Sequence, residues 1–371
     1  KILKREHFLN LSRNSYLLSK VAILIIISSV QTLLFVLIAN PILGIKGMYF
    51  HYWLALFTTS FCANMIGLNI SASFNSAITI YIFIPLLIIP MMVLSGAMFP
   101  FDKLNRKIGN VDKVPFIAEL MPTRWTYEAL IVSQFIDNKY NQIPFTKQGE
   151  TNYDLLKKIS EAEFNRTFRI KALREALQTV LFEFRSNPKN IGNNEDFLIK
   201  KSVRKFSKLA LLKNELEKMV AVYNVPPFNY LSDLTPYEFN PGVADSLTKY
   251  LDRLDKAFSI ISNQASDRKD KFFNMNDLKL KKLEEDYYNH KLEDLVTKPY
   301  ESKKILVYNN TLVQNTDPIY LDPYRKGFFN FRTHFFAPAK YIFGLKTETF
   351  VFNISIVLLS SIFFYFVLYF D

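Results

Sequence analysis

The sequence is poor in cysteine, glycine and histidine, and each scarcity excludes a class of protein. The single cysteine, Cys62, rules out a disulfide scaffold. There are ten glycines in 371 residues, and neither G-x-x-x-x-G-K-[ST] nor G-x-G-x-x-G occurs, so a phosphate-binding loop is not expected. The four histidines are scattered, and none has a His or Cys neighbour at metal-ligand spacing. We therefore expect no metal site, no bound cofactor and no catalytic centre in this segment.

The charge balance does not indicate nucleic-acid binding. The net charge of +12 arises from 46 basic and 34 acidic side chains, which are interspersed and form no dense basic stripe. Acidic runs such as Glu284–Glu285 fit the solvated face of a charged helix better than a catalytic pair. We expect no nucleic-acid partner.

Long apolar runs are the main positive signal. Four segments are long enough to cross a hydrocarbon core of about 30 Å as helices, and they cover residues 16–39, 49–68, 77–99 and 349–370. Pro85 and Pro90 should kink the third span. The predicted fold class is an all-α membrane protein with four transmembrane helices and a large external, mainly helical insertion.

Basic residues around the first span set the expected topology. They flank its N-terminal side, with Lys1, Lys4, Arg5 and Arg13 before the span and Lys20 near its start, whereas only Lys46 follows it in the next loop. The positive-inside rule then places the N-terminus in the cytoplasm. Residues 100–345 fall on the other side, so we expect a multi-pass inner-membrane protein with a periplasmic or extracellular domain.

The external segment reads as a helical domain. Apolar side chains recur at three- and four-residue spacing in residues 119–139, 152–185, 195–223 and 243–296. Residues 304–313 resemble a short hairpin with Asn309–Asn310 as its turn. Two interpretations remain open for the helical stripes, namely the packed core of a bundle and a platform for another envelope protein.

Polar residues within the spans are costly in lipid unless they face other helices or a cavity. Gln31, Asn64, Asn69 and Ser71 fit helix–helix contacts better than substrate contacts. Gly96 closely precedes Pro100 at the end of the third span, a pattern that indicates a re-entrant turn.

Three stretches together resemble the transmembrane half of G-subfamily-like (type V) ABC exporters, including bacterial forms with a fused ATPase. The most specific is Leu94-Ser95-Gly96-Ala97-Met98-Phe99 followed by Pro122-Thr123-Arg124-Trp125-x-Tyr127-Glu128-Ala129-Leu130. The others are Arg5-Glu6-x-x-x-Asn10-Leu11 before the first span and Lys346-Thr347-Glu348-Thr349-Phe350-Val351-Phe352-Asn353 before the last. The middle of the chain, about residues 145–325, has no counterpart in this family.

The resemblance implies a homodimeric exporter, in which these four spans are the last four of six. Since the sequence begins without Met inside an apparent helix, we expect a C-terminal fragment whose ATPase domain, with its ATP and Mg, lies upstream. The implied order is a cytoplasmic coupling segment (1–15), three spans (16–99), a re-entrant turn and external helix (100–145), the external insertion (146–330), a pre-membrane segment (331–348) and the last span (349–371).

The resemblance also implies roles for individual residues. Contact with the ATPase falls to Arg5, Glu6 and Asn10. The substrate path is lined by Ile84, Leu87, Met91 and Leu94, and the re-entrant turn or plug comprises Ser95, Gly96, Ala97 and Met98. The external helix motif comprises Pro122, Arg124, Trp125 and Glu128. Ala97 stands where the family often has a second bulky residue, which weakens the prediction of a tight plug.

The predicted function is the permease part of an ATP-driven exporter of an apolar or amphipathic compound. The alternative is a non-transporting membrane scaffold whose external domain binds an envelope partner. An ion channel or secondary carrier fits less well, because the spans lack the acidic and basic side chains that such proteins commonly use.

Overall fold

The computed structural model describes residues 12–74, 76–101, 104, 112–145, 149–185, 195–324 and 331–370. It divides into two compact units. The membrane unit comprises Lys1–Tyr140, Lys282–Asn289 and Phe331–Asp371. The helical unit comprises Asn141–Lys281 and His290–Asn330.

Three helices of the membrane unit are long and apolar enough to cross a bilayer: α2 (Arg13–Ile42), α3 (Tyr49–Ser73) and α12 (Thr349–Phe370). The apolar helix α4 (Ala77–Val93) has 17 residues, or about 25 Å of rise. It ends before the predicted limit of residue 99, because the chain turns at Leu94–Phe99. The mostly helical membrane fold is confirmed, and α4 is shorter than we expected.

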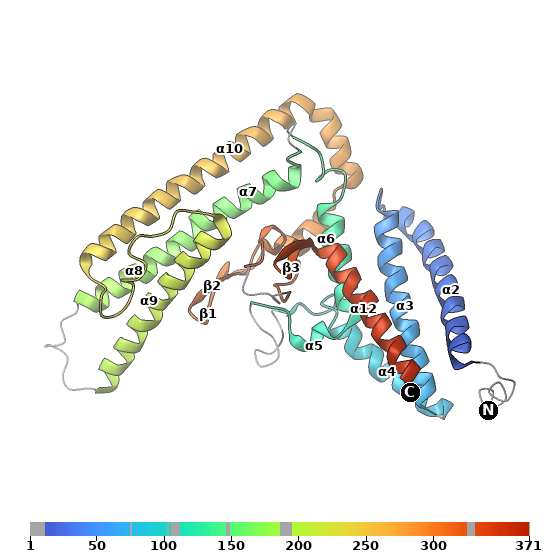
Figure 1. Ribbon diagram of the computed structural model, residues 1–371. Helices are drawn as coiled ribbons and strands as arrows, with labels where there is room; N and C mark the ends of the chain where they lie inside the picture. Colours follow the sequence, from blue (N-terminus) through green and yellow to red (C-terminus); the bar gives the residue numbers. More distant parts are fainter. Residues whose placement is uncertain are drawn as a thin grey trace. The chain divides into compact units, whose positions relative to one another are not determined.

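The core of the membrane unit is a helix bundle. Two further helices, α5 (Phe116–Glu119) and α6 (Pro122–Ile136), follow the turn after α4. Helices α3, α6 and α12 pack against one another, α2 packs on α3, and α4 contacts α6 (Figure 1). Ala55 of α3 and Ala129 of α6 are fully buried beside Ile354 of α12. Such small side chains let helix backbones approach closely.

Polar side chains join these helices. Asn64 donates to Ser28 Oγ of α2 at 2.6 Å, and Asn69 donates to the carbonyl of Phe364 in α12 at 2.9 Å. These contacts confirm the expected packing role of both asparagines. The other two polar residues, Gln31 and Ser71, are exposed.

A short hairpin that we did not predict leads into α12. Strands β3 (Ala339–Ile342) and β4 (Leu345–Glu348) pair antiparallel, with Ile342 opposite Leu345. The two turn residues, Phe343 and Gly344, both have positive φ, as a type I′ turn requires.

The helical unit contains a run of long helices. They are α7 (Asn152–Phe164), a π-helical turn (Asn165–Arg169), α8 (Ile170–Arg185), α9 (Glu195–Tyr223), α10 (Pro241–Tyr287) and α11 (His290–Thr297). The predicted helices 152–185 and 195–223 match this run. The predicted stretch 243–296 divides into α10 and α11. The end of α10, from Lys282, belongs to the membrane unit, where Asp286 pairs with Lys46 at 2.5 Å.

The core of the helical unit is formed by the apolar stripes read from the sequence. One buried cluster includes Leu173, Leu177 and Val180 of α8, Leu209, Leu212 and Leu216 of α9, and Leu247, Leu251 and Leu254 of α10. Each fully buried leucine contributes about 1.5–3 kcal/mol. With no cysteine in this unit, apolar packing of this kind is the main source of its stability.

The predicted hairpin is present as β1 (Ile305–Tyr308) and β2 (Thr311–Gln314). Asn309 and Asn310 both have positive φ, which asparagine tolerates in a two-residue turn. The outer edge of β2 is closed by α9, since Leu312 donates its N–H to Glu215 at 2.7 Å. The carbonyl of Leu312 accepts a hydrogen bond from Lys218 at 2.8 Å.

Candidate functional site

The turn after α4 depends on Gly96. Ser95 Oγ donates to the carbonyl of Met92 at 2.7 Å and accepts the N–H of Ala97 at 3.2 Å. Gly96 has a φ of +82°, a region that favours glycine. A Cβ atom at this position would lie 2.7 Å from Cζ of Phe335. Both the backbone conformation and the close approach of Phe335 therefore favour glycine at this turn.

The end of α4 is fixed to the start of α6. Thr123 Oγ1 donates to the carbonyl of Met91 at 2.9 Å. Leu94 packs against a small cluster of Phe101, Val114 and Ala118. These contacts connect the end of α4 to the start of α6 and to α5.

A buried ion cluster lies along α6. Glu128 Oε2 is 3.0 Å from Arg124 Nη2 and 2.9 Å from Lys340 Nζ of β3. Asn353 of α12 donates to the same oxygen at 2.8 Å and to the carbonyl of Trp125 at 3.0 Å. All three charged side chains are at most 1% exposed. One carboxylate thus joins α6, the β3–β4 hairpin and α12.

Aromatic rings surround the excess positive charge of this cluster. The Arg124 guanidinium lies 4.0 Å from the Trp125 ring centroid and 5.8 Å from that of Phe335. Two of its nitrogens, Nε and Nη1, have no hydrogen-bond partner among the residues that the structure describes. Cation–π attraction offsets part of the cost of burying them. Lys340 also lies 5.2 Å from the Trp125 ring and donates to Thr333 at 3.2 Å.

For both Glu128 and Lys340, burial and ion pairing shift the pKa in opposite directions. For Glu128, burial raises the pKa, but the charges of Arg124 and Lys340 outweigh it and hold the pKa below the ordinary 4.5. For Lys340, burial prevails over the attraction of Glu128 and lowers the pKa from 10.5 to about 8. Glu128 is therefore ionised at neutral pH, whereas Lys340 loses its proton in mildly alkaline solution.

This shift predicts a pH dependence of stability. Between about pH 8 and about pH 10.5 the unfolded chain still binds the Lys340 proton that the folded chain has released. Stability should therefore rise with pH across this window, by up to about 3 kcal/mol. Thermal unfolding of the protein in detergent measures it. The rise should be smaller in Lys340→Met, and an equal rise in both proteins would contradict the assignment.

A second ion pair continues the cluster toward α5. Arg332 Nε lies 2.8 Å from Glu119 Oε1, and Arg332 also donates to the carbonyl of Val114 at 3.0 Å. Trp125 Nε1 donates to the carbonyl of Glu119 at 2.7 Å. The segment before the last span is thereby held against both α5 and α6.

The structure brings together some of the predicted residues. The four of the external helix motif, Pro122, Arg124, Trp125 and Glu128, are all buried on α6, and Gly96 lies against Phe335 beside them. Ala97 and Met98 are exposed in the single chain. The predicted coupling residues Arg5, Glu6 and Asn10 lie outside the described residues.

The predicted substrate path lies on α4, where no side chain is fully buried. Ile84 is exposed, and Leu87, Met91 and Leu94 are partly buried. The substrate-path role of these four residues stays a prediction.

The predicted site residues did not include Lys340, Asn353 or Phe335, although Asn353 ends the motif before the last span that carried the family resemblance. A lysine between apolar neighbours in residues 335–342 and an asparagine at the start of an apolar span are both costly to bury. Each of these two residues therefore indicated that a buried polar or charged group pairs with it. The identity of that partner, Glu128, was not readable because it is more than 200 residues away in the sequence.

One family of known proteins matches about the first third of the chain. Residues 1–135 match the family of ABC-2 type transporter membrane domains. No curated protein and no solved structure matches the chain. The match supports an ABC transporter permease, a protein that associates with the lipid bilayer and with a nucleotide-binding ATPase partner.

Proposed function

We propose that this chain is the membrane-spanning permease part of an ATP-driven exporter of the G-subfamily-like (type V) class. In this proposal it moves an apolar or amphipathic compound out of the cytoplasm or the inner leaflet. ATP and Mg bind in an ATPase domain that precedes these residues or belongs to a partner chain. The functional form is a homodimer in the inner membrane, with the helical unit on the periplasmic or extracellular side.

The observation that carries the proposal is the exposed apolar surface of α4, taken together with the family match. Its sequence is apolar throughout, yet none of its side chains is fully buried within one chain. Ile82 and Leu86 are 68% and 65% exposed. A surface of this kind is stable only against lipid, a second copy or an apolar substrate. An α4 that faces its counterpart in a dimer would offer an apolar path.

The contacts of the site support a way of controlling that path. Thr123 links α6 to the end of α4, and Glu128 links α6 to α12. We infer that α6, the β3–β4 hairpin and α12 move as one body. A shift of this body would then reposition the Gly96 turn at the end of the path.

A double substitution tests the coupling to ATP. Replacing Arg5 and Glu6 with Ala should lower ATP-dependent efflux of amphipathic fluorescent dyes, because the proposed contact with the ATPase is lost. Nucleotide binding should be unchanged, since the substitutions lie outside the ATPase. Lys4→Ala in the same segment is the control and should have little effect. Unchanged efflux in the double variant would sink the coupling role.

The scaffold alternative predicts a different result in the same assay. A scaffold would show no ATP-dependent dye movement with any variant, even with a competent ATPase. The helical unit gives this alternative some support, because it is large enough to bind a partner. Transport activity of the unmodified protein decides between the two.

A further inference from the structure

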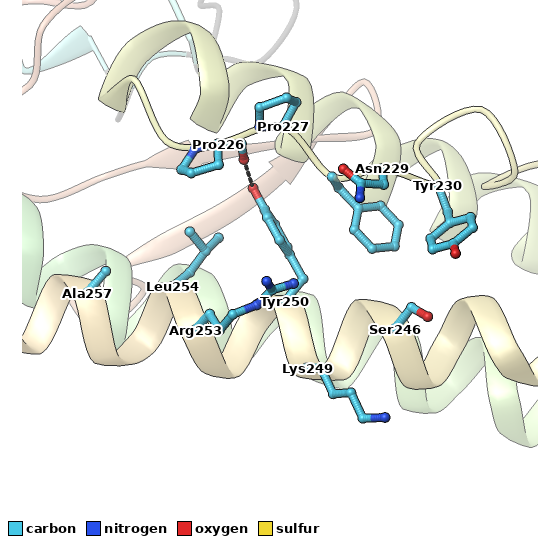
Figure 2. A pocket seen from close by; sticks show the side chains of 11 residues that line it. Pro226, Pro227, Asn229, Tyr230, Ser246, Lys249, Tyr250, Arg253, Leu254 and Ala257 are labelled. Atoms are coloured by element: carbon cyan, nitrogen blue, oxygen red, sulfur yellow. Dashed lines mark hydrogen bonds between the residues drawn. The ribbon is translucent and has the colours of Figure 1, made fainter.

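A hollow on the surface of the helical unit lies between the chain that follows α9 and the first half of α10. Its volume is about 500 Å³, and eleven residues line it, from residues 226–230 and from α10. Figure 2 shows Tyr250 rising from α10 to Pro226 across the hollow. The site is separate from the ion cluster and the Gly96 turn, and it lies entirely within one unit.

The wall of the hollow is held together by a hydrogen bond, two prolines and ring packing. Tyr250 Oη donates to the carbonyl of Pro226 at 2.7 Å, and the rings of Pro226 and Pro227 fix their backbone φ angles. Phe228 is buried, with its ring 5.3 Å from that of Tyr250 and 6.0 Å from that of Tyr230. A preformed aromatic wall loses little entropy when a ligand is bound.

The charge of the lining is positive. It includes Lys249 and Arg253 and no acidic residue. Lys249 pairs with the exposed Asp245 at 2.8 Å, whereas Arg253 has no ion pair among the described residues. Burial raises the pKa of Tyr250, and the positive charge of Arg253 opposes part of this rise. Arg253 therefore acts electrostatically on the aromatic wall of the hollow. A carboxylate is therefore the complementary group.

The neighbouring acids of α10 do not neutralise Arg253. Asp252 and Asp255 lie 2.8 Å and 3.5 Å from the guanidinium of Arg174 on α8. Arg253 thus stays available to an acidic group that enters from solvent.

The openness of the hollow favours a polypeptide over a small molecule. Seven of its eleven lining residues are exposed, among them Tyr230 at 47%. Small-molecule sites usually enclose about 70–90% of their ligand. Protein interfaces, in contrast, commonly combine aromatic side chains and arginine around a half-open pocket.

We propose that this hollow binds an acidic peptide segment of a partner protein. One aromatic side chain of the peptide packs against Phe228 and Tyr230, and an adjacent carboxylate pairs with Arg253. The proposal does not depend on export activity, because the hollow lies outside the membrane unit and shares no residue with the transport path.

Fluorescence anisotropy tests the proposal with the full chain in detergent. The probe is a labelled peptide of sequence Asp-Glu-Phe-Glu-Asp, and we expect saturable binding. Arg253→Ala should weaken it about tenfold or more, the loss expected for one charge-assisted hydrogen bond. Tyr230→Ala should weaken it by a similar factor through lost apolar contact. Both residues are exposed, so the variants should keep the wild-type unfolding temperature.

Matched controls distinguish binding in the hollow from non-specific electrostatic attraction of the acidic peptide. Lys256→Ala also removes one positive charge from α10, but Lys256 does not line the hollow. This variant should therefore bind the peptide as the wild type does. A peptide with Ser in place of Phe should bind at least tenfold more weakly.

Four results would overturn the proposal. The first is no saturable binding up to about 1 mM peptide, which corresponds to a binding free energy weaker than about −4 kcal/mol. The second is equal binding by the wild type and Arg253→Ala, and the third is a loss in Lys256→Ala as large as that in Arg253→Ala. The fourth is displacement of the peptide by phenylacetate at equal concentration. The last result would indicate a small-molecule site.

Discussion

Glu128→Gln will lower the free energy of unfolding of the membrane unit by about 3–5 kcal/mol. The substitution keeps the shape of the side chain but removes its charge, and it leaves Arg124 and Lys340 buried together without an anion. Breaking a buried ion cluster by removing one partner costs far more than the intact cluster contributes. Thermal unfolding of the protein in detergent, followed by tryptophan fluorescence, measures the change.

The matched control for this prediction is Glu285→Gln. Glu285 is exposed in the part of α10 that belongs to the membrane unit, so its neutralisation should change stability by less than about 0.5 kcal/mol. Adding Lys340→Met to Glu128→Gln removes one of the two unpaired cations and should recover part of the loss. If the double variant is no more stable than Glu128→Gln, the charges are not coupled as described.

Gly96→Ala will destabilise the turn after α4 by about 2–5 kcal/mol. A positive φ costs an L-residue about 1–2 kcal/mol. Overpacking adds about 1–3 kcal/mol, because the new methyl group would lie 2.7 Å from Phe335 and 2.9 Å from Phe101. Transport should fall as well, since the turn closes the end of the proposed path. Thermal unfolding and dye efflux measure the two effects.

Gly44 provides a control with the same backbone strain and no crowding. Its φ is +70°, and in the described part of the chain no atom beyond its immediate neighbours lies within 4 Å of a Cβ placed there. Gly44→Ala should therefore cost only about 1–2 kcal/mol, the strain alone. Gly96→Ala combined with Phe335→Leu should recover part of the packing loss. An equal effect at both glycines would show that contact with Phe335 is unimportant.

The helices of this protein were largely readable from the sequence, because apolar periodicity and length are local properties. The stripe that includes Leu209 and Leu216 predicted α9, and Asn309–Asn310 predicted the β1–β2 hairpin through turn chemistry. The end of α4 was misplaced, since Leu94 to Phe99 continue the apolar run although the chain turns there. Gly96 indicated the turn itself, but the sequence did not show that the helix ends three residues before it, at Val93.

The site was only half predictable. Gly96, Arg124 and Glu128 lie in recognisable motifs, so their importance could be inferred from the sequence. Lys340 and Asn353 join them through contacts that span more than 200 residues, which no local pattern encodes. The β3–β4 hairpin that positions Lys340 was missed because its strands have four residues each and its turn begins with Phe343, an uncommon residue at positive φ.

The central claim is that this chain forms an ATP-driven path through the membrane. The most direct test is the movement of amphipathic fluorescent dyes across vesicles that contain the full-length protein with its ATPase. We predict movement with ATP and none with a non-hydrolysable analogue. ATP hydrolysis without movement of any dye would contradict the account and would favour a membrane scaffold.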